Sequence, residues 1–167
     1  MTDWRDTVLA MDLGPYCYSA TVTVTASPEA VYDLVADVSR MGEWSPVCTG
    51  CQWQDEARTR FVGTNELGGR TWQTVCRVEV ATRGREFTFI NTGMDGSADL
   101  VKWSYTIALA DGGCALTESW ELLPGYPEYR LKGQPDLDLT SALGQGLDNA
   151  RAGITQTLAN LKAAAES

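Results

Sequence analysis

Polar and apolar residues alternate strictly near the start of the chain. Between residues 16 and 26, tyrosine, alanine and valine side chains fall on one face, and mostly serine and threonine fall on the other. This period of two is typical of a half-buried strand. Ser27 then precedes Pro28, which suits a helix N-cap followed by the first helical position. A second short helical piece is expected over residues 39–44. It should end there because Pro46 disfavours helical geometry in the residue before it. The pattern predicts one strand and then two short helices.

The alternation returns at Gly50 and continues to about residue 122. Its interruptions are turn signals rich in glycine, at Gly68-Gly69, Arg83-Gly84, 93–96 and 111–113. Strands joined by such short turns form an antiparallel meander, which can bury one face and leave the other in water. We therefore predict a six- or seven-stranded antiparallel sheet.

The last part of the chain has a different pattern. Residues 124–136 contain three prolines and two glycines and are expected to form a long loop. From Leu143 to Leu161, apolar residues then recur at steps of three and four, the spacing of an amphipathic helix. We predict that this helix spans about Leu139 to Ala164 and packs on the apolar face of the sheet.

Composition places the chain among soluble globular domains. Of its 167 residues, 44% are hydrophobic and 21% charged, and such a length can bury a sizeable core. No apolar run reaches the roughly 20 residues of a membrane-spanning helix, and the first residues lack the order of a signal peptide. We expect a cytoplasmic protein with an N-terminal arm over residues 1–15 and one domain over 16–167.

The charge balance and the missing histidine exclude several functions. Thirteen lysines and arginines against 22 acidic residues give a net charge of −9, which repels phosphate backbones, so nucleic acid is not an expected partner. Six arginines between Arg58 and Arg85 are interleaved with glutamates and are interpreted as a solvated mixed-charge face. With no histidine in the chain, mechanisms that need an imidazole base and metal centres ligated by histidine are excluded.

Five cysteines are scattered along the sequence, and their odd number does not suggest a disulfide framework. Cys48 and Cys51 have the two-residue gap of redox and zinc sites, but no second pair completes a zinc site. Packing or pocket lining is favoured over redox chemistry, since free cysteine is mostly a small buried apolar residue. No metal or other cofactor is expected.

Several motifs together resemble one known superfamily. They are Ala26-Ser-Pro-Glu-Ala-Val-Tyr-Asp-Leu-Val-Ala-Asp-Val-Ser-Arg-Met-Gly-Glu-Trp-Ser-Pro46, Gly69-Arg-Thr-Trp-Gln-Thr-Val-Cys-Arg-Val78, Trp103-Ser-Tyr105, Gly113-Cys-Ala-Leu-Thr-Glu-Ser-Trp120 and Thr157-Leu-Ala-Asn-Leu-Lys162. Over residues 16 to 164 the chain resembles the START-like superfamily, also called SRPBCC, and within it the polyketide cyclase/dehydrase and lipid transport family. This resemblance implies an α+β helix-grip fold, in which a curved antiparallel sheet wraps a long C-terminal helix and leaves an apolar cavity. Family members include aromatase/cyclases, sterol and phospholipid carriers, and hormone receptors, and the family has no universal catalytic motif.

Side chains alternate between the two faces of each strand, and this alternation indicates which of them would line the cavity. Trp44 is expected near its mouth, and the aromatic residues on the helix-facing side of the sheet serve either as core packing or as a slot for a flat or elongated apolar ligand. Arg70 follows a glycine turn and is better explained as pointing out of a hairpin. Glu118 falls mid-strand between Leu116 and Trp120, where an unpaired carboxylate is costly. The candidate ligand-binding residues are Trp44, Trp53, Asn65, Arg70, Trp72, Thr74, Phe87, Phe89, Trp103, Tyr105, Glu118 and Trp120.

Three functions follow from this reading. A binder would carry a small hydrophobic molecule, such as a lipid or an aromatic polyketide, in the cavity. A polyketide cyclase or dehydratase would use Glu118, Tyr105 and Asn65 as acid, base and carbonyl anchor. A protein-interaction module would act through its surface and keep only a vestigial cavity. The lack of histidine and of a dense catalytic cluster favours the binder, and the sequence leaves open whether the protein forms a homodimer.

Overall fold

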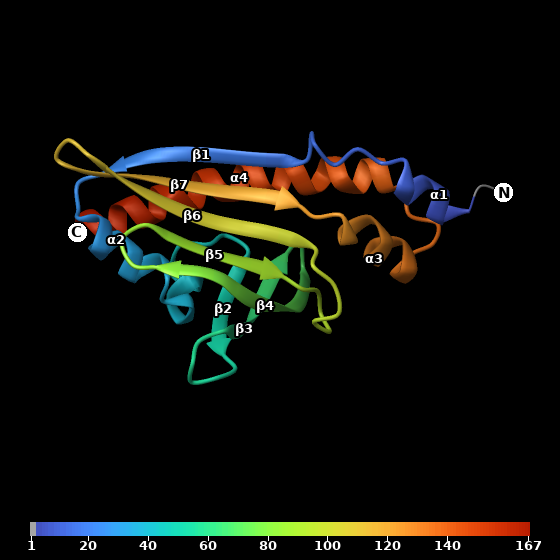
Figure 1. The fold of residues 1–167 in the computed structure, drawn as a ribbon, viewed down its shortest axis with the longest axis horizontal. Coiled ribbons are helices and arrows are strands. Elements are labelled where there is room, and N and C mark those ends of the chain that lie inside the picture. The colour runs from blue at the N-terminus through green and yellow to red at the C-terminus, as the bar shows by residue number, and fades with distance from the viewer. Residues whose placement is uncertain (1–2) are drawn as a thin grey trace.

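The computed structural model describes residues 3–167. Helices and strands alternate only near its N-terminus, since the central part is a continuous run of strands and two helices follow it (Figure 1). In chain order the elements are α1 (Trp4–Leu9), β1 (Cys17–Val24), α2 (Pro28–Val35), the 3₁₀-helix η1 (Val38–Glu43), β2 (Cys48–Trp53), β3 (Arg60–Leu67), β4 (Arg70–Thr82), β5 (Glu86–Asn91), β6 (Val101–Ala110), β7 (Gly113–Leu122), α3 (Gly125–Gly133) and α4 (Leu139–Glu166).

All seven strands pair antiparallel in one sheet of order β1-β7-β6-β5-β4-β3-β2. The meander from β2 to β7 follows the chain, and β1 joins the far side of β7. The sheet is strongly curved, so that β2, β3 and β4 turn away from the direction of β1 and β7 (Figure 1). The predicted antiparallel sheet and C-terminal helix are therefore confirmed.

Both helices predicted between the first strands are present, and the first begins at its capping signal. The Ser27 hydroxyl accepts a hydrogen bond from the Ala30 amide at 3.1 Å, and Pro28 is the first residue of α2. The serine hydroxyl provides an acceptor for one of the free amides in the first turn. The proline has no amide hydrogen and therefore needs no acceptor. Both features place the start of the helix here. The second short helix is η1.

Helix α4 is the largest element against the sheet. It begins after Asp138, whose carboxylate accepts from the Ser141 amide at 3.2 Å, and it runs behind β1 and β7 along their whole length (Figure 1). Its side chains Leu143 and Ile154 are fully buried in the core. At the N-terminus, α1 lies near α3, and Trp4 and Val8 pack partly buried against the same core.

The prediction of a long loop over residues 124–136 is wrong, because most of this segment forms helix α3. Two prolines fall at positions that a helix tolerates: Pro124 is the N-cap and Pro127 lies in the first turn, where amide groups have no intrahelical acceptor. The helix ends at Gly133, shortly before Pro135. The number of prolines alone therefore does not predict a loop, because the effect of each proline depends on its position in a helix.

The C-terminal turn of α4 also binds the outer edge of β1. The Lys162 ammonium donates to the Thr23 carbonyl at 2.6 Å, and the Glu166 carboxylate accepts from the Thr25 amide at 2.8 Å. Lys162 and Glu166 pair with each other at 2.7 Å. Within residues 3–167, no helix is both long and apolar enough to cross a membrane.

Candidate ligand cavity

A cavity of about 240 Å³ lies between the curved sheet and α4. Strands β2 to β7 and the segment after η1 form one side of it, and the middle of α4 forms the other. Most of its wall is aromatic, aliphatic or sulfur-bearing. The lining residues are Met41, Ser45, Pro46, Val47, Cys48, Cys51, Phe61, Gly63, Asn65, Leu67, Trp72, Thr74, Cys76, Phe89, Asn91, Trp103, Tyr105, Glu118, Trp120, Gly146, Asn149, Ala150, Gly153 and Thr157.

The exposed members of this set mark where the cavity opens. Pro46 after η1, Leu67 at the end of β3 and Asn149 on α4 are all exposed to solvent while lining the cavity. The opening thus lies between the end of the β3–β4 hairpin and the middle of α4.

Small residues of α4 face the cavity. Gly146, Ala150 and Gly153 follow each other at helical spacing on the inner side of the helix. A β-carbon at Gly153 would meet no atom within 4 Å, and one at Gly146 would meet only the Trp120 ring at 3.8 Å. These glycines therefore leave open space beside the helix, and close packing does not explain them.

The most buried charged group in the cavity wall is Glu118 on β7, with 3% of its surface exposed. Tyr105 lies directly opposite it on β6, and the Tyr105 hydroxyl donates to Glu118 Oε1 at 3.1 Å. Glu118 Oε2 is buried and has no hydrogen-bond partner within residues 3–167. One carboxyl oxygen is satisfied by the protein, and the other is available to a molecule in the cavity.

Burial determines the ionisation of this pair. Loss of water around the carboxyl raises the pKa of Glu118 from its usual 4.5 to about 8, against the opposing effect of the Tyr105 hydrogen bond. Burial, and next the charge of Glu118, also raise the pKa of Tyr105 well above its usual 10. Near neutral pH, Glu118 is therefore a neutral carboxylic acid whose proton can sit on Oε2, facing away from Tyr105.

A β-bulge in β2 brings two cysteines to the same wall. Residues three apart in a regular strand point to opposite faces, but the register of β2 against β3 shifts between Cys48 and Gly50. The extra residue, Thr49, lets Cys48 and Cys51 both face inward, with their sulfurs 3.4 Å apart. Cys51 also contacts the Met41 sulfur at 3.8 Å.

Polar side chains stand beside these sulfurs. The Asn65 amide donates to the Thr74 hydroxyl at 3.2 Å across the β3–β4 ladder, and Asn65 pairs with Cys48 across the β2–β3 ladder. The cavity thus has two polar regions, one around Glu118 and one around Cys48 and Cys51, within an otherwise apolar wall.

Comparison with known families agrees with this arrangement of sheet, helix and cavity. Residues 16–166 match the family described as polyketide cyclase / dehydrase and lipid transport. The chain belongs to this family. Membership and the structural neighbours support a hydrophobic ligand-binding fold.

Solved structures similar to the chain include three of particular interest. A polyketide-cyclase-like protein from Corynebacterium glutamicum, Cgl2372, is 32% identical, with a TM-score of 0.62 over 88% of this chain and 89% of that one. The di-domain ARO/CYC StfQ of the steffimycin biosynthetic pathway is 13% identical, with a TM-score of 0.69 over 90% of this chain and 50% of that one. A START superfamily protein from Mycobacterium smegmatis is 18% identical, with a TM-score of 0.52 over 81% and 95% of the two chains. No protein with a curated description matches the chain significantly.

In this family member, eight of the residues nominated from strand parity face the cavity. These are Asn65, Trp72, Thr74, Phe89, Trp103, Tyr105, Glu118 and Trp120. Their part in ligand binding or catalysis stays a prediction.

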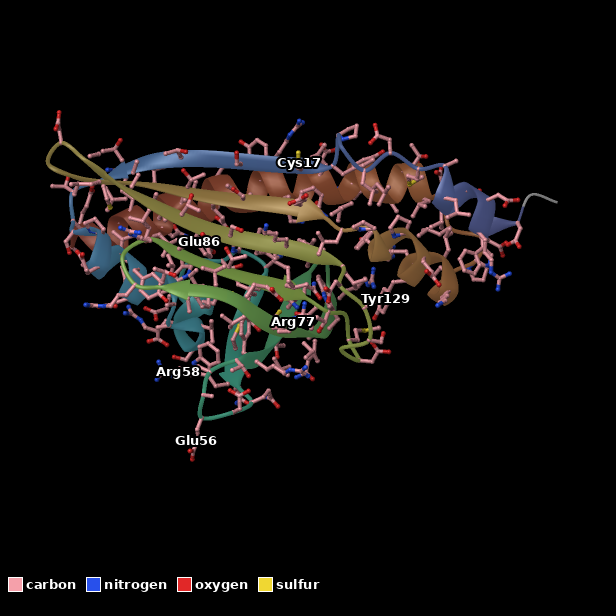
Figure 2. The ribbon with its side chains drawn as sticks, viewed as in Figure 1. Cys17, Glu56, Arg58, Arg77, Glu86 and Tyr129 are labelled. Atoms are coloured by element: carbon pink, nitrogen blue, oxygen red, sulfur yellow. The ribbon has the colours of Figure 1, made fainter. Side chains whose placement is uncertain are left out.

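The other four nominated residues do not line the cavity. Phe87 has the predicted inward parity, but α2 covers its end of the sheet and the ring packs edge-on against Tyr32 at 6.4 Å. Trp53 packs on Phe61 and lies under the guanidinium of Arg58, a residue near the tip of the β2–β3 hairpin (Figure 2). Arg70 is exposed at the first position of β4, as its turn suggested.

Trp44 was predicted near the mouth, but it is 2% exposed and buried beneath other side chains. Its backbone carbonyl accepts from the Asn160 amide group at 3.0 Å, and its ring lies under the Arg40 guanidinium. These contacts tie the end of η1 to α4, which is a structural role.

The family resemblance placed the cavity between the sheet and the C-terminal helix, but the residues of α4 that line it were not predicted. A signal was present, because Gly146, Ala150 and Gly153 place small residues along the inner stripe of a helix whose other inner residues are mostly leucine and isoleucine. The two-residue gap between Cys48 and Cys51 was visible in the sequence, and packing or pocket lining was favoured for them. An alternating pattern gives no sign of the bulge that turns both thiols to the same wall.

Proposed function

We propose that this protein binds and carries a small hydrophobic molecule that bears a carbonyl or hydroxyl group. The observation that carries the proposal is Glu118, a buried carboxyl with one free oxygen in the wall of an apolar cavity. Buried polar groups nearly always have a partner. A ligand oxygen that accepts the proton of the neutral carboxyl would provide it.

The size of the cavity limits the ligand. A cavity of about 150 Å³ lined by apolar side chains admits benzene, and the cavity here is about 240 Å³. This favours a ligand with one or two rings, or a short chain, over a phospholipid or a full-length polyketide. The aromatic wall, with Trp72, Trp103 and Trp120, suits a flat ring.

A second candidate function is general-acid catalysis on a bound ketone or alcohol. It is favoured by the pKa of about 8 for Glu118, since an acid with such a pKa can transfer a proton near neutral pH. The family name and the fold shared with StfQ are consistent with a cyclase or dehydratase. Carriage is preferred because the cavity, at about 240 Å³, is small for a polyketide chain.

Titration with 4-phenylbutan-2-one, followed by tryptophan fluorescence, tests the proposal. Butylbenzene is the matched hydrocarbon, since it has the same ring and nearly the same length without the carbonyl. Both compounds should quench the emission, and Trp53→Phe should leave the change intact because Trp53 lies outside the cavity.

The variant Glu118→Leu then isolates the polar anchor. Ketone affinity should fall about tenfold, the worth of a typical hydrogen bond, while butylbenzene affinity stays the same in a protein that remains folded by circular dichroism. If neither compound binds to the wild-type protein, the proposed function is wrong. If Glu118→Leu leaves ketone affinity unchanged, Glu118 is not the anchor.

A further inference from the structure

The second polar region of the cavity contains a reactive arrangement that hydrophobic carriage does not need. Gly63 on β3 pairs with Cys51 across the ladder and has no side chain, so it leaves a pocket in the wall. The position that a β-carbon would occupy at Gly63 lies 3.4 Å from Cys51 Sγ, 3.5 Å from Thr74 Oγ1 and 3.9 Å from Cys48 Sγ. A small group that reaches this point touches two sulfurs and a hydroxyl together.

The two thiols are not equivalent. The hydrogen bond from Cys51 lowers the pKa of Cys48, and the same bond raises the pKa of Cys51. Cys48 is therefore favoured as the thiolate, which is the nucleophilic form of cysteine, while Cys51 keeps its proton. Both are 7% exposed and line the cavity, so a molecule meets them by entering it.

The geometry points to a covalent capture site: we propose that α,β-unsaturated ketones entering the cavity add to Cys48, with Cys51 as the proton donor. This inference rests on the proposed function, because the ketone must first bind, and it specifies the chemical class of ligand. An apolar enone fits the wall, and a carbon at the Gly63 site lies 3.9 Å from Cys48 Sγ, so that a small displacement brings it to the roughly 3–3.5 Å from which a thiolate attacks.

The reaction balances without an oxidant. Cys48 releases its thiol proton to water, and its thiolate forms a C–S bond to the β-carbon of the enone. The C=C π pair shifts towards the carbonyl as an enolate, Cys51 gives its proton to the α-carbon, and water returns a proton to Cys51. The net result is addition of one thiol across one double bond, with nothing oxidised or reduced.

The other three cysteines lack this combination. Cys76 lines the cavity, but burial raises the pKa of its thiol to about 12. Cys114 is buried outside the cavity. Cys17 is exposed on β1, at the outer edge of the sheet (Figure 2), where it meets electrophiles in water without any binding step. Replacing Cys17 with serine removes this competing thiol from the experiment.

The test uses 4-phenylbut-3-en-2-one and its saturated analogue, 4-phenylbutan-2-one, on the full chain carrying Cys17→Ser. Mass spectrometry of the intact protein should show addition of one enone, mapped to Cys48 by peptide sequencing. The saturated ketone should bind without a mass change and slow the labelling when present in excess.

Three variants probe the mechanism. Cys48→Ser should abolish labelling. Cys51→Ser should slow it about a hundredfold, the lower range of what a positioned proton donor contributes. Gly63→Ala keeps both thiols and makes only ordinary contacts with its neighbours, yet its methyl group occupies the reaction point and should slow labelling about a hundredfold as well.

Other results would overturn the inference. If the saturated ketone binds but the enone gives no adduct, the proposed function survives and the capture site does not exist. An adduct on Cys76, or a Gly63→Ala variant that reacts as fast as its parent, has the same meaning. If neither ketone binds, the proposed function fails and the capture site fails with it.

Discussion

Tyr105 and Glu118 lie directly opposite each other on neighbouring strands, joined by a 3.1 Å hydrogen bond from the Tyr105 hydroxyl to Glu118 Oε1. Both are almost fully buried. The Tyr105 hydroxyl, placed by the pairing of β6 with β7, thus determines which carboxyl oxygen is left for a ligand.

The raised pKa of Glu118 makes stability depend on pH. The folded protein keeps the proton up to a pKa of about 8, while the unfolded chain loses it near 4.5, so the folded state binds more protons between these values and stability falls as pH rises through this window. The full difference corresponds to an upper limit of about 5 kcal/mol. Urea unfolding at pH 5, 6.5 and 8 should show this loss in the wild type and a smaller one in Glu118→Gln. Parallel profiles for the two proteins would contradict it.

The affinity for a ketone should depend on whether Glu118 is protonated. Affinity for 4-phenylbutan-2-one should be constant below the pKa of about 8 and then fall by about tenfold in total, because the carboxylate has no proton to donate and only the apolar contacts remain. Glu118→Gln retains a donor in its amide and should bind with little pH dependence. Fluorescence titrations from pH 6 to 9.5 measure both. A variant as pH-sensitive as the wild type would place the titrating group elsewhere.

Removing the Tyr105 hydroxyl should lower the stability of the folded protein even when Glu118 is kept. Tyr105→Phe leaves Glu118 Oε1 buried without a donor, which should destabilise the protein by about 1–3 kcal/mol. It also removes the hydrogen bond that lowers the pKa of Glu118, so the loss of stability, which still begins near the unfolded pKa of 4.5, should continue to a higher pH than in the wild type. The double variant Tyr105→Phe with Glu118→Leu should lose less than the sum of the two single variants, because no polar atom is left unpaired.

The glycines of α4 separate stability from binding. Gly144→Ala and Gly153→Ala should each stabilise the helix by up to about 1 kcal/mol, since a methyl group at either position meets no atom within 4 Å. Gly153 lines the cavity and Gly144 does not. Thermal melts should rise for both, whereas affinity for 4-phenylbutan-2-one should fall only for Gly153→Ala. Equal affinity in the two variants would mean that the ligand does not reach the middle of α4.

Local patterns in the sequence predicted most of the fold. A period of two predicted the strands, and the steps of three and four predicted α4 to within a few residues, because these periods follow directly from backbone geometry. The same parity identified the inward face of β6 and β7, including Tyr105 and Glu118. It failed for Phe87, because parity gives the face of the sheet and says nothing about what covers each end of a strand.

Other features depend on contacts that periodicity does not describe. The bulge at Thr49 turns Cys48 and Cys51 to the same face, whereas a regular strand would place residues three apart on opposite faces. The segment of α3 was misread because the effect of a proline depends on its position in a helix. Trp44 was misplaced because its tie to Asn160 spans 116 residues of sequence.

The contacts of Lys162 and Glu166 with the outer backbone of β1 have a consequence for self-association. An open sheet edge is where a strand from another molecule adds, and such additions lead to aggregation. Here the Thr23 carbonyl and the Thr25 amide are already engaged by side chains of α4. At the opposite edge, β2 is short and carries the bulge after Cys48, which disrupts the regular ladder that an incoming strand requires. A chain shortened before Lys162 would uncover the β1 edge and should form intermolecular β-sheet at concentrations where the full chain remains dispersed.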